Sequence, residues 1–230
     1  MSRRSRVAIL CAALGFLLPA SGQAQWSASV DFSTAANPNG AWSYGSRDLP
    51  DLLLSTLSLY TLAGNTAPFD SWDFDGSLNP GVFRNNTGAS LGGALPLDPG
   101  QLALHPGSGG QFSIVRWTAP ASATYALASQ FTNIYFASTD VHVLLNGSLL
   151  FSELIDQYGE TQSFSDLLSL NAGDVVEFAV GFGNGGYVGD STGLEATIDE
   201  TSATPEPSSI LLLASGLIAT VAAIRRRTRA

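Results

Sequence analysis

The last segment of the chain places the strongest physical constraint on its fold. From Ser208 to Ile224 no side chain carries a charge, and most residues are Leu, Ile, Val or Ala. As a helix rising about 1.5 Å per residue, this stretch is roughly 25 Å long, close to the thickness of a hydrocarbon core. It lacks the polar face that a buried helix of a water-soluble domain shows. It therefore predicts a transmembrane helix, held by arginines that stay on the cytoplasmic side: Arg225, Arg226, Arg227 and Arg229.

A short polar motif, Pro205-Glu206-Pro207, precedes this apolar stretch. Motif, helix and basic cluster in this order resemble the PEP-CTERM sorting signal of Gram-negative bacteria, over residues 205–230. The resemblance implies that an exosortase, a membrane transpeptidase-like enzyme, recognises Pro205, Glu206 and Pro207 and removes the helix. These three residues would then be a substrate and not a catalytic site.

The N-terminus has the layout of a secretory signal peptide over residues 1–24. Arg3, Arg4 and Arg6 precede an apolar run from Val7 to Leu18, and small residues lead to a cleavage point after Ala24. The apolar run is too short to span a bilayer. We therefore expect export by the Sec machinery and cleavage by signal peptidase.

Between the two signals lies an acidic ectodomain, residues 25–200, followed by a linker at 201–204. Three arginines and eighteen Asp or Glu side chains give residues 25–204 a net charge of about −15. A surface this acidic repels nucleic acid, so nucleic-acid binding is excluded. The one cysteine, Cys11, lies in the signal peptide, so disulfides do not stabilise the ectodomain.

Alternating apolar residues predict an all-β ectodomain, an antiparallel β-sandwich or jelly roll. The period of two is visible in residues 26–32, 111–118, 124–136, 176–182 and 194–198. Asn146-Gly147, between apolar runs, is a strong signal for a two-residue hairpin. Residues 65–100, rich in Gly, Pro, Asn and Asp, predict long loops with one or two short strands.

Four stretches of the second half are similar to PEP-CTERM ectodomains and to jelly-roll modules that resemble carbohydrate-binding domains. They are residues 104–107, 115–120, 143–147 and 172–178, and the similarity spans roughly residues 100–200. The resemblance supports the fold more than any ligand, because no set of sugar-binding residues matches it.

Motifs for catalysis are weak, so we expect the protein not to be an enzyme. Gly181 to Gly186 fits the dinucleotide pattern G-x-G-x-x-G, but the residues after it lack the helical period that phosphate binding requires. The two histidines, His105 and His142, are far apart in sequence and offer little material for a zinc site. A pair of carboxylates for glycoside cleavage stays open as an alternative.

Two kinds of binding residue stand out in the ectodomain. Asp70, Asp73 and Asp75 beside Gly76, together with Asp190, could hold a structural calcium ion, although a solvated turn is the commoner explanation of such aspartates. No other cofactor is expected. Aromatic side chains could stack on sugar rings, with Trp72 and Tyr187 in loops as the best exposed candidates. The full set of aromatic candidates is Trp42, Tyr44, Trp72, Trp117, Tyr158 and Tyr187.

Together these features predict an exported, non-enzymatic protein of a Gram-negative bacterium. Its precursor would be anchored in the inner membrane by the C-terminal helix, sorted by exosortase, and delivered to the cell surface or extracellular matrix. There it would act as a structural or polysaccharide-binding element of the envelope, exopolysaccharide or biofilm. The alternative is a secreted polysaccharide-active enzyme that uses a carboxylate pair.

Overall fold

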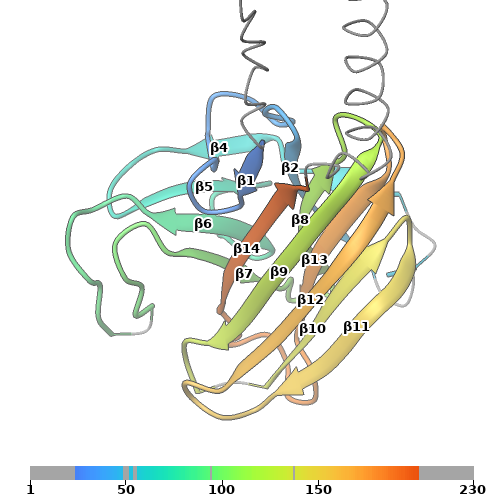
Figure 1. Ribbon diagram of the computed structural model, residues 1–230. Helices are drawn as coiled ribbons and strands as arrows, with labels where there is room; N and C mark the ends of the chain where they lie inside the picture. The colour runs from blue at the N-terminus through green and yellow to red at the C-terminus, as the bar shows by residue number, and fades with distance from the viewer. Residues whose placement is uncertain (1–23, 49–51, 54–55, 94, 137, 202–230) are drawn as a thin grey trace, which may run out of the picture.

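The computed structural model describes residues 24–48, 52–53, 56–93, 95–136 and 138–201. These residues form two antiparallel sheets packed face to face (Figure 1), which confirms the predicted all-β sandwich. The predicted signal peptide up to residue 23, the sorting motif, the apolar stretch and the arginine cluster lie outside the described residues. Within the described ranges, no helix has the length and apolar character needed to cross a bilayer.

The larger sheet has the strand order β12-β9-β14-β7-β6-β5-β4, and β1 pairs with β14 beside this path. Its long strands β9, β12 and β14 pair in unbroken antiparallel register. The strands of this sheet are β1 (Gln25–Ser27), β4 (Leu62–Gly64), β5 (Phe69–Asp73), β6 (Gly81–Asn85), β7 (Leu102–His105), β9 (Ala123–Asn133), β12 (Thr161–Leu170) and β14 (Thr192–Glu200).

The second sheet has the order β11-β10-β13-β8-β2-β3. The predicted hairpin joins β10 to β11, with Asn146 at φ 51° and Gly147 at φ 79°, the left-handed pair that a tight β-turn requires. The strands of this sheet are β2 (Trp42–Arg47), β3 (Ser58–Leu59), β8 (Phe112–Thr118), β10 (Thr139–Leu145), β11 (Ser148–Ile155) and β13 (Val175–Gly181).

The main core fills the space between the two sheets. Trp117 of β8 and Tyr125 of β9 meet edge to face with ring centroids 5.0 Å apart, and Trp26 packs against both rings. Trp117 and Tyr125 are fully buried, as are Phe131 of β9 and Phe178 of β13. These large side chains come from both sheets and hold the layers together by removing aromatic and aliphatic surface from water.

The expected first strand over residues 26–32 is wrong after Ser27. Backbone N–H of Asp31 donates to the carbonyl of Ser27 at 2.9 Å, and Ser27 N–H donates to the Asp31 carboxylate at 2.8 Å. This turn reverses the chain and leaves Val30 76% exposed, although its place in the alternation predicted an inward side chain. A short acidic side chain that bonds a nearby backbone group competes with strand pairing in this way.

The two ends of the sandwich differ in what they carry. At one end Gln25 of β1 pairs with Asp199 of β14, so both ends of the described chain leave the domain there. The loops β9–β10, β11–β12 and β13–β14 gather at the opposite end, at the bottom of Figure 1. We call these the terminal end and the loop end.

Candidate functional site

A cavity of about 450 Å³ opens at the loop end of the sandwich. His105 at the end of β7, Tyr135 after β9 and Tyr187 between β13 and β14 contribute rings to its wall. The rest of the wall comes from strand β6, the β5–β6 and β6–β7 loops and the turn before β14. We call this cavity the Tyr187 pocket, and its remaining lining residues are Ser77, Leu78, Asn79, Phe83, Leu95, Val188, Gly189 and Ser191.

The rings of the Tyr187 pocket continue onto an open surface. Tyr187 meets His105 edge to face, with centroids 6.3 Å apart, inside the pocket. On the other wall Tyr135 contacts Phe136 at 5.8 Å, and Phe136 stacks on Tyr158 at 5.0 Å with 27° between the ring planes. Phe136 is 79% exposed and Tyr158 is 57% exposed. We call Tyr135, Phe136 and Tyr158 the aromatic ledge.

Two polar atoms of the pocket wall lack partners. Asn79 Oδ1 and Ser191 Oγ are buried and accept or donate no hydrogen bond among the described residues. Buried polar groups are nearly always hydrogen-bonded, so such atoms call for a water or a ligand. Leu78, next to Asn79, holds φ at 59°, a left-handed conformation that is costly for a branched side chain and common at binding sites.

His105 presents a neutral ring to the pocket. Burial lowers the pKa of His105, although its hydrogen bond to the carbonyl of Pro106 opposes this shift. The Nδ1–carbonyl distance is 2.7 Å, and since a carbonyl only accepts, Nδ1 carries the proton and donates. The neutral ring then leaves Nε2 as an acceptor, suited to a hydroxyl group.

A pair of aspartates lies behind the pocket wall. Asp190, 1% exposed, has a pKa raised to about 7 by burial and by the charge of Asp140. Burial disfavours the charged form of Asp140 as well, but hydrogen bonds from His142 and from Gly183 N–H outweigh burial and lower its pKa. The His142 Nε2–Asp140 Oδ2 distance is 2.8 Å, and the Gly183 N–Asp140 Oδ1 distance is 2.7 Å. Asp140 is therefore the charged member of the pair at neutral pH.

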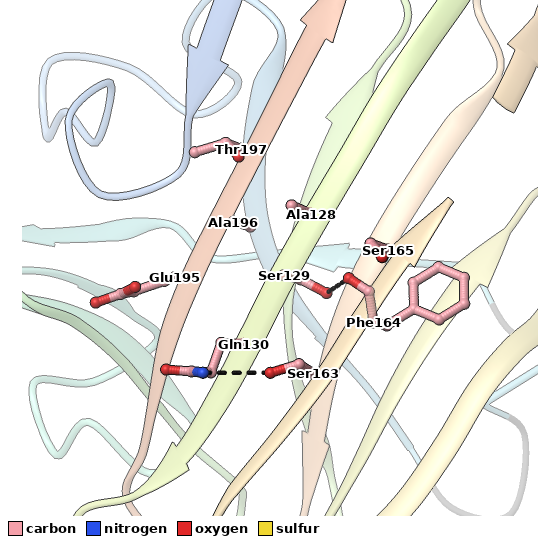
Figure 2. A pocket seen from close by; sticks show the side chains of 9 residues that line it. All are labelled: Ala128, Ser129, Gln130, Ser163, Phe164, Ser165, Glu195, Ala196 and Thr197. Atoms are coloured by element: carbon pink, nitrogen blue, oxygen red, sulfur yellow. Dashed lines mark hydrogen bonds between the residues drawn. The ribbon is translucent and has the colours of Figure 1, made fainter. Parts of the chain in front are cut away.

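A second hollow, of about 320 Å³, lies on the outer face of β9, β12 and β14 (Figure 2). Gln130 Nε2 donates to Ser163 Oγ at 3.2 Å, and Ser129 Oγ donates to the Phe164 carbonyl at 3.3 Å. The Phe164 ring points away from the hollow in Figure 2 and packs against the main core. This face offers hydroxyl, amide and carboxylate groups but no flat apolar surface, so it suits a sugar ring less well than the Tyr187 pocket.

The predicted aromatic pair divides between core and site. Tyr187 lies in the pocket, half-buried, with one side toward the cavity. Trp72, contrary to expectation, is only 6% exposed, and its Nε1 donates to the Ser33 carbonyl at 2.8 Å. It sits in β5, whose inward face packs against the core, so its ring is not open to a ligand. Trp42, Tyr44 and Trp117 are core residues too.

The four aspartates expected to hold calcium do not form one cluster, and Asp70, Asp73 and Asp75 bond to other groups, Asp75 to the N–H of Ser77 at 2.9 Å. Asp70 pairs with Arg84 at 3.0 Å, and Asp73 accepts the N–H groups of Asp75 and Gly76 in a tight turn. Asp190 lies behind the Tyr187 pocket. Among the residues that the structure describes, no three His, Cys, Asp or Glu side chains gather as a metal site. Calcium binding stays a prediction without a ligand cluster to support it.

Sequence reasoning missed Tyr135, Phe136 and Asn79 as site residues. Tyr135 and Phe136 come just after the long alternating strand β9, separated from it by Ile134, and these adjacent apolar residues break the inward–outward alternation. That break was a usable signal for an exposed ring. Nothing local marks Asn79, because its burial depends on loops that are distant in sequence.

The C-terminus matches a known family model, described as "PEP-CTERM protein-sorting motif", over residues 203–227. This confirms the resemblance of the C-terminal segment to that sorting signal. The motif marks the chain as an exported precursor that an exosortase processes. No sequence among curated proteins matches the chain.

Solved structures give partial and distant matches. A family 35 carbohydrate-binding module from Clostridium thermocellum is 19% identical over 39% of this chain and 69% of that one, with a TM-score of 0.28. A CBM51 module from Clostridium perfringens in complex with methyl-galactose is 12% identical over 43% of this chain and 68% of that one, with a TM-score of 0.31. A GH26-CBM35 β-(1,4)-mannanase from Podospora anserina is 13% identical over 81% of this chain but 29% of its own, also at 0.31. Similarity this low carries no argument about the ligand.

Proposed function

We propose that this exosortase-targeted protein is a non-enzymatic component of the cell surface or extracellular matrix that binds polysaccharide through the Tyr187 pocket. The observation that carries the proposal is the combination of ring surfaces with unpartnered polar atoms in one cavity. Tyr187 and Tyr135 supply the rings, and Asn79 and Ser191 supply the polar atoms. Ligand sites typically combine a mainly apolar wall with a few such groups.

The chemistry of a sugar fits this wall. The C–H face of a pyranose ring is apolar and packs on an aromatic plane, as Tyr187 and Tyr135 offer. Its hydroxyl groups both donate and accept, so they could satisfy Asn79 Oδ1, Ser191 Oγ and the free Nε2 of His105. A purely apolar ligand would leave these atoms unpaired, at a cost of about 1–3 kcal/mol for each buried group.

The position of the pocket favours a surface role. β14 begins beside the pocket at Thr192 and ends at Glu200, close to the segment that leads to the sorting motif (Figure 1). Nine strand residues span roughly 30 Å at about 3.3 Å per residue. A precursor held in the inner membrane by its C-terminus would thus carry the pocket on the side away from the point of attachment.

Titration calorimetry of the full chain, purified in a detergent without sugar groups, tests the binding. We expect Tyr187→Ala to weaken polysaccharide binding about tenfold and Tyr187→Phe to keep it, because the ring and not the hydroxyl does the stacking. Tenfold corresponds to about 1.4 kcal/mol. Leu167→Ala is the control, since Leu167 is an exposed apolar side chain on β12, outside the pocket lining. If no polysaccharide binds the wild type, with or without calcium, the binding role is wrong.

Cell fractionation tests the sorting. In cells that lack exosortase, we expect the ectodomain to stay in the inner-membrane fraction with the tail attached. Replacing Pro205, Glu206 and Pro207 by alanine should have the same effect in cells that contain the enzyme. Antibodies against the ectodomain and the tail distinguish processed from intact protein, and a tail retained equally in all strains would contradict exosortase processing.

The enzymatic alternative could act in a hollow that two carboxylates line. Asp98 and Glu195 both line a hollow of about 370 Å³ beside β14, where a pair of carboxylates could flank a glycosidic bond. Asp98 accepts a hydrogen bond from Ser90 Oγ at 2.7 Å. Release of reducing ends that disappears in both Asp98→Asn and Glu195→Gln would favour this alternative, and binding without hydrolysis would favour the non-enzymatic role.

A further inference from the structure

We infer that the ligand is an electrically neutral glycan chain, long enough for one sugar unit to occupy the Tyr187 pocket while the next units lie on the aromatic ledge. This inference rests on the proposed function and adds to it the charge and the length of the ligand. The first depends on the charges of the domain, and the second on how the rings are arranged.

The ledge continues the pocket outward. Tyr135 lines the pocket and contacts Phe136, which in turn stacks on Tyr158. Each step is a ring contact of 5 to 6 Å, so Tyr158 lies two rings away from the pocket wall. A single sugar unit in the pocket cannot also cover these rings, whereas a chain of several units can.

The exposure of the ledge indicates that a partner covers it. Phe136 is 79% exposed, and Val188 of the pocket rim is exposed to the same extent. Soluble proteins rarely expose several large apolar side chains together on one surface, and where they do, the surface is commonly an interaction site. The stack of Phe136 on Tyr158 also presents two rings at an angle of 27° to each other, a surface on which successive sugar units can pack.

No cation is available to receive an acidic sugar. The ectodomain has three arginines and no lysine, and Arg47, Arg84 and Arg116 each form an ion pair with a carboxylate of the domain. Uronate or sulfate groups are normally held by arginine or lysine in paired hydrogen bonds. The residues lining the Tyr187 pocket carry no formal charge once His105 is neutral.

Carboxylates next to the ledge would repel an anionic chain. Tyr158 lies in the β11–β12 loop between Asp156 and Glu160. Glu160 accepts the N–H groups of Asp156 and Gln157 at 3.0 and 3.1 Å, which lowers its pKa and keeps it ionised. The same repulsion disfavours a second copy of this chain, because two ectodomains each carry about −15. A neutral glycan avoids both costs.

The experiment compares neutral and acidic oligosaccharides of one to four units, titrated into the full chain in sugar-free detergent. We expect the neutral tetramer to bind at least tenfold more tightly than its monomer, and at least tenfold more tightly than an oligouronate tetramer. Binding of the neutral tetramer should not change between low and high salt. Residual oligouronate binding should strengthen with salt, since salt screens the repulsion.

Single substitutions distinguish the contribution of the aromatic ledge to binding from that of the Tyr187 pocket. Phe136→Ala and Tyr158→Ala should weaken the neutral tetramer about five- to thirtyfold and leave the monomer, measured by competition, unchanged. Leu167→Ala should change neither. The inference is overturned if oligouronates bind as tightly as the neutral chain, or if the ledge variants bind the tetramer as well as the wild type does. Tyr187→Ala tests the pocket itself independently of both outcomes. Sedimentation that shows a dimer lost in Phe136→Ala would also overturn it, in favour of a second copy on the ledge.

Discussion

Replacing Glu177 by glutamine removes the charge on which two arginines converge inside the second sheet. Glu177 of β13 is fully buried and its Oε1 accepts from Arg47 Nη2 at 2.7 Å, Arg116 Nη2 at 2.6 Å and Arg116 Nε at 2.8 Å. Arg47 is only 6% exposed, and its Nη1 also donates to the Leu52 carbonyl at 2.7 Å. In the Glu177→Gln variant Arg47 would keep its charge in the interior without a counter-ion.

The size of the effect follows from this burial. Breaking a buried ion pair by removing one partner costs about 3–5 kcal/mol, because the remaining charge stays unpaired away from water. Arg116 is 23% exposed and can turn toward solvent, so most of the cost falls on Arg47. A domain of this kind has a total stability of about 5–15 kcal/mol, so the loss is a large part of it.

Urea unfolding, followed by tryptophan fluorescence, measures the loss directly. We expect Glu177→Gln to lower the free energy of unfolding by about 3–5 kcal/mol and Glu153→Gln, at an exposed position of β11, to change it by less than about 0.5 kcal/mol. Arg47→Met should leave a stable pair between Glu177 and Arg116 and cost less than Glu177→Gln. A loss below about 1 kcal/mol in Glu177→Gln would refute this reasoning, since the buried arginine would then need no counter-ion.

Three further predictions concern single side chains. Because the pKa of Asp190 is raised to about 7, the folded state holds a proton that the unfolded state releases near pH 4. Its contribution to stability is therefore present below about pH 4 and is lost as the pH rises through 7, so Asp190→Asn should raise the melting temperature relative to wild type more at pH 8 than at pH 5. Gly147→Ala should lower the free energy of unfolding in urea by about 1–2 kcal/mol, since alanine is strained at a φ of 79°. Gly100→Ala, at an exposed loop position with φ 75°, is the comparison. A smaller loss of stability in Gly147→Ala than in Gly100→Ala would contradict the role of the hairpin. Trp72→Phe should lower stability by about 1 kcal/mol through loss of the bond to the Ser33 carbonyl and leave glycan binding unchanged in calorimetry, whereas weakened binding would return Trp72 to the site.

Much of the second sheet was predictable because its signals are local. The Asn146-Gly147 turn predicts the hairpin of β10 and β11, and the alternation in residues 176–182 predicts β13 to within one residue at each end. Strand β12 was missed, although it pairs with β9 over ten residues. Its outward face combines Ser163 and Ser165 with Leu167, and its inward face combines Gln162 with Phe164. Neither face is therefore clearly apolar or clearly polar in the sequence. Pairing with β9, and not its own pattern, makes this segment a strand.

The proposed binding site shows the same division between local and tertiary information. Tyr187 was chosen because it lies in a glycine-rich loop, and the structure places it in the pocket. Trp72 was chosen by the same reasoning, but strand β5 turns its ring into the core. A loop-rich sequence does not tell which aromatic side chain faces inward, because that depends on which layer covers it.

The sequence by itself determined the sorting motif at the C-terminus and the acidic, all-β nature of the middle of this protein. An uncharged apolar segment followed by arginines, an acidic body and period-two strands are properties of residues close together in the chain, so they can be read without a fold. The tertiary structure alone decided where the pocket lies, which rings stay exposed and which arginines are neutralised. These depend on contacts between residues far apart in sequence, such as Arg47 with Glu177 and the rings of His105 and Tyr187, and such contacts exist only once the sheets have packed.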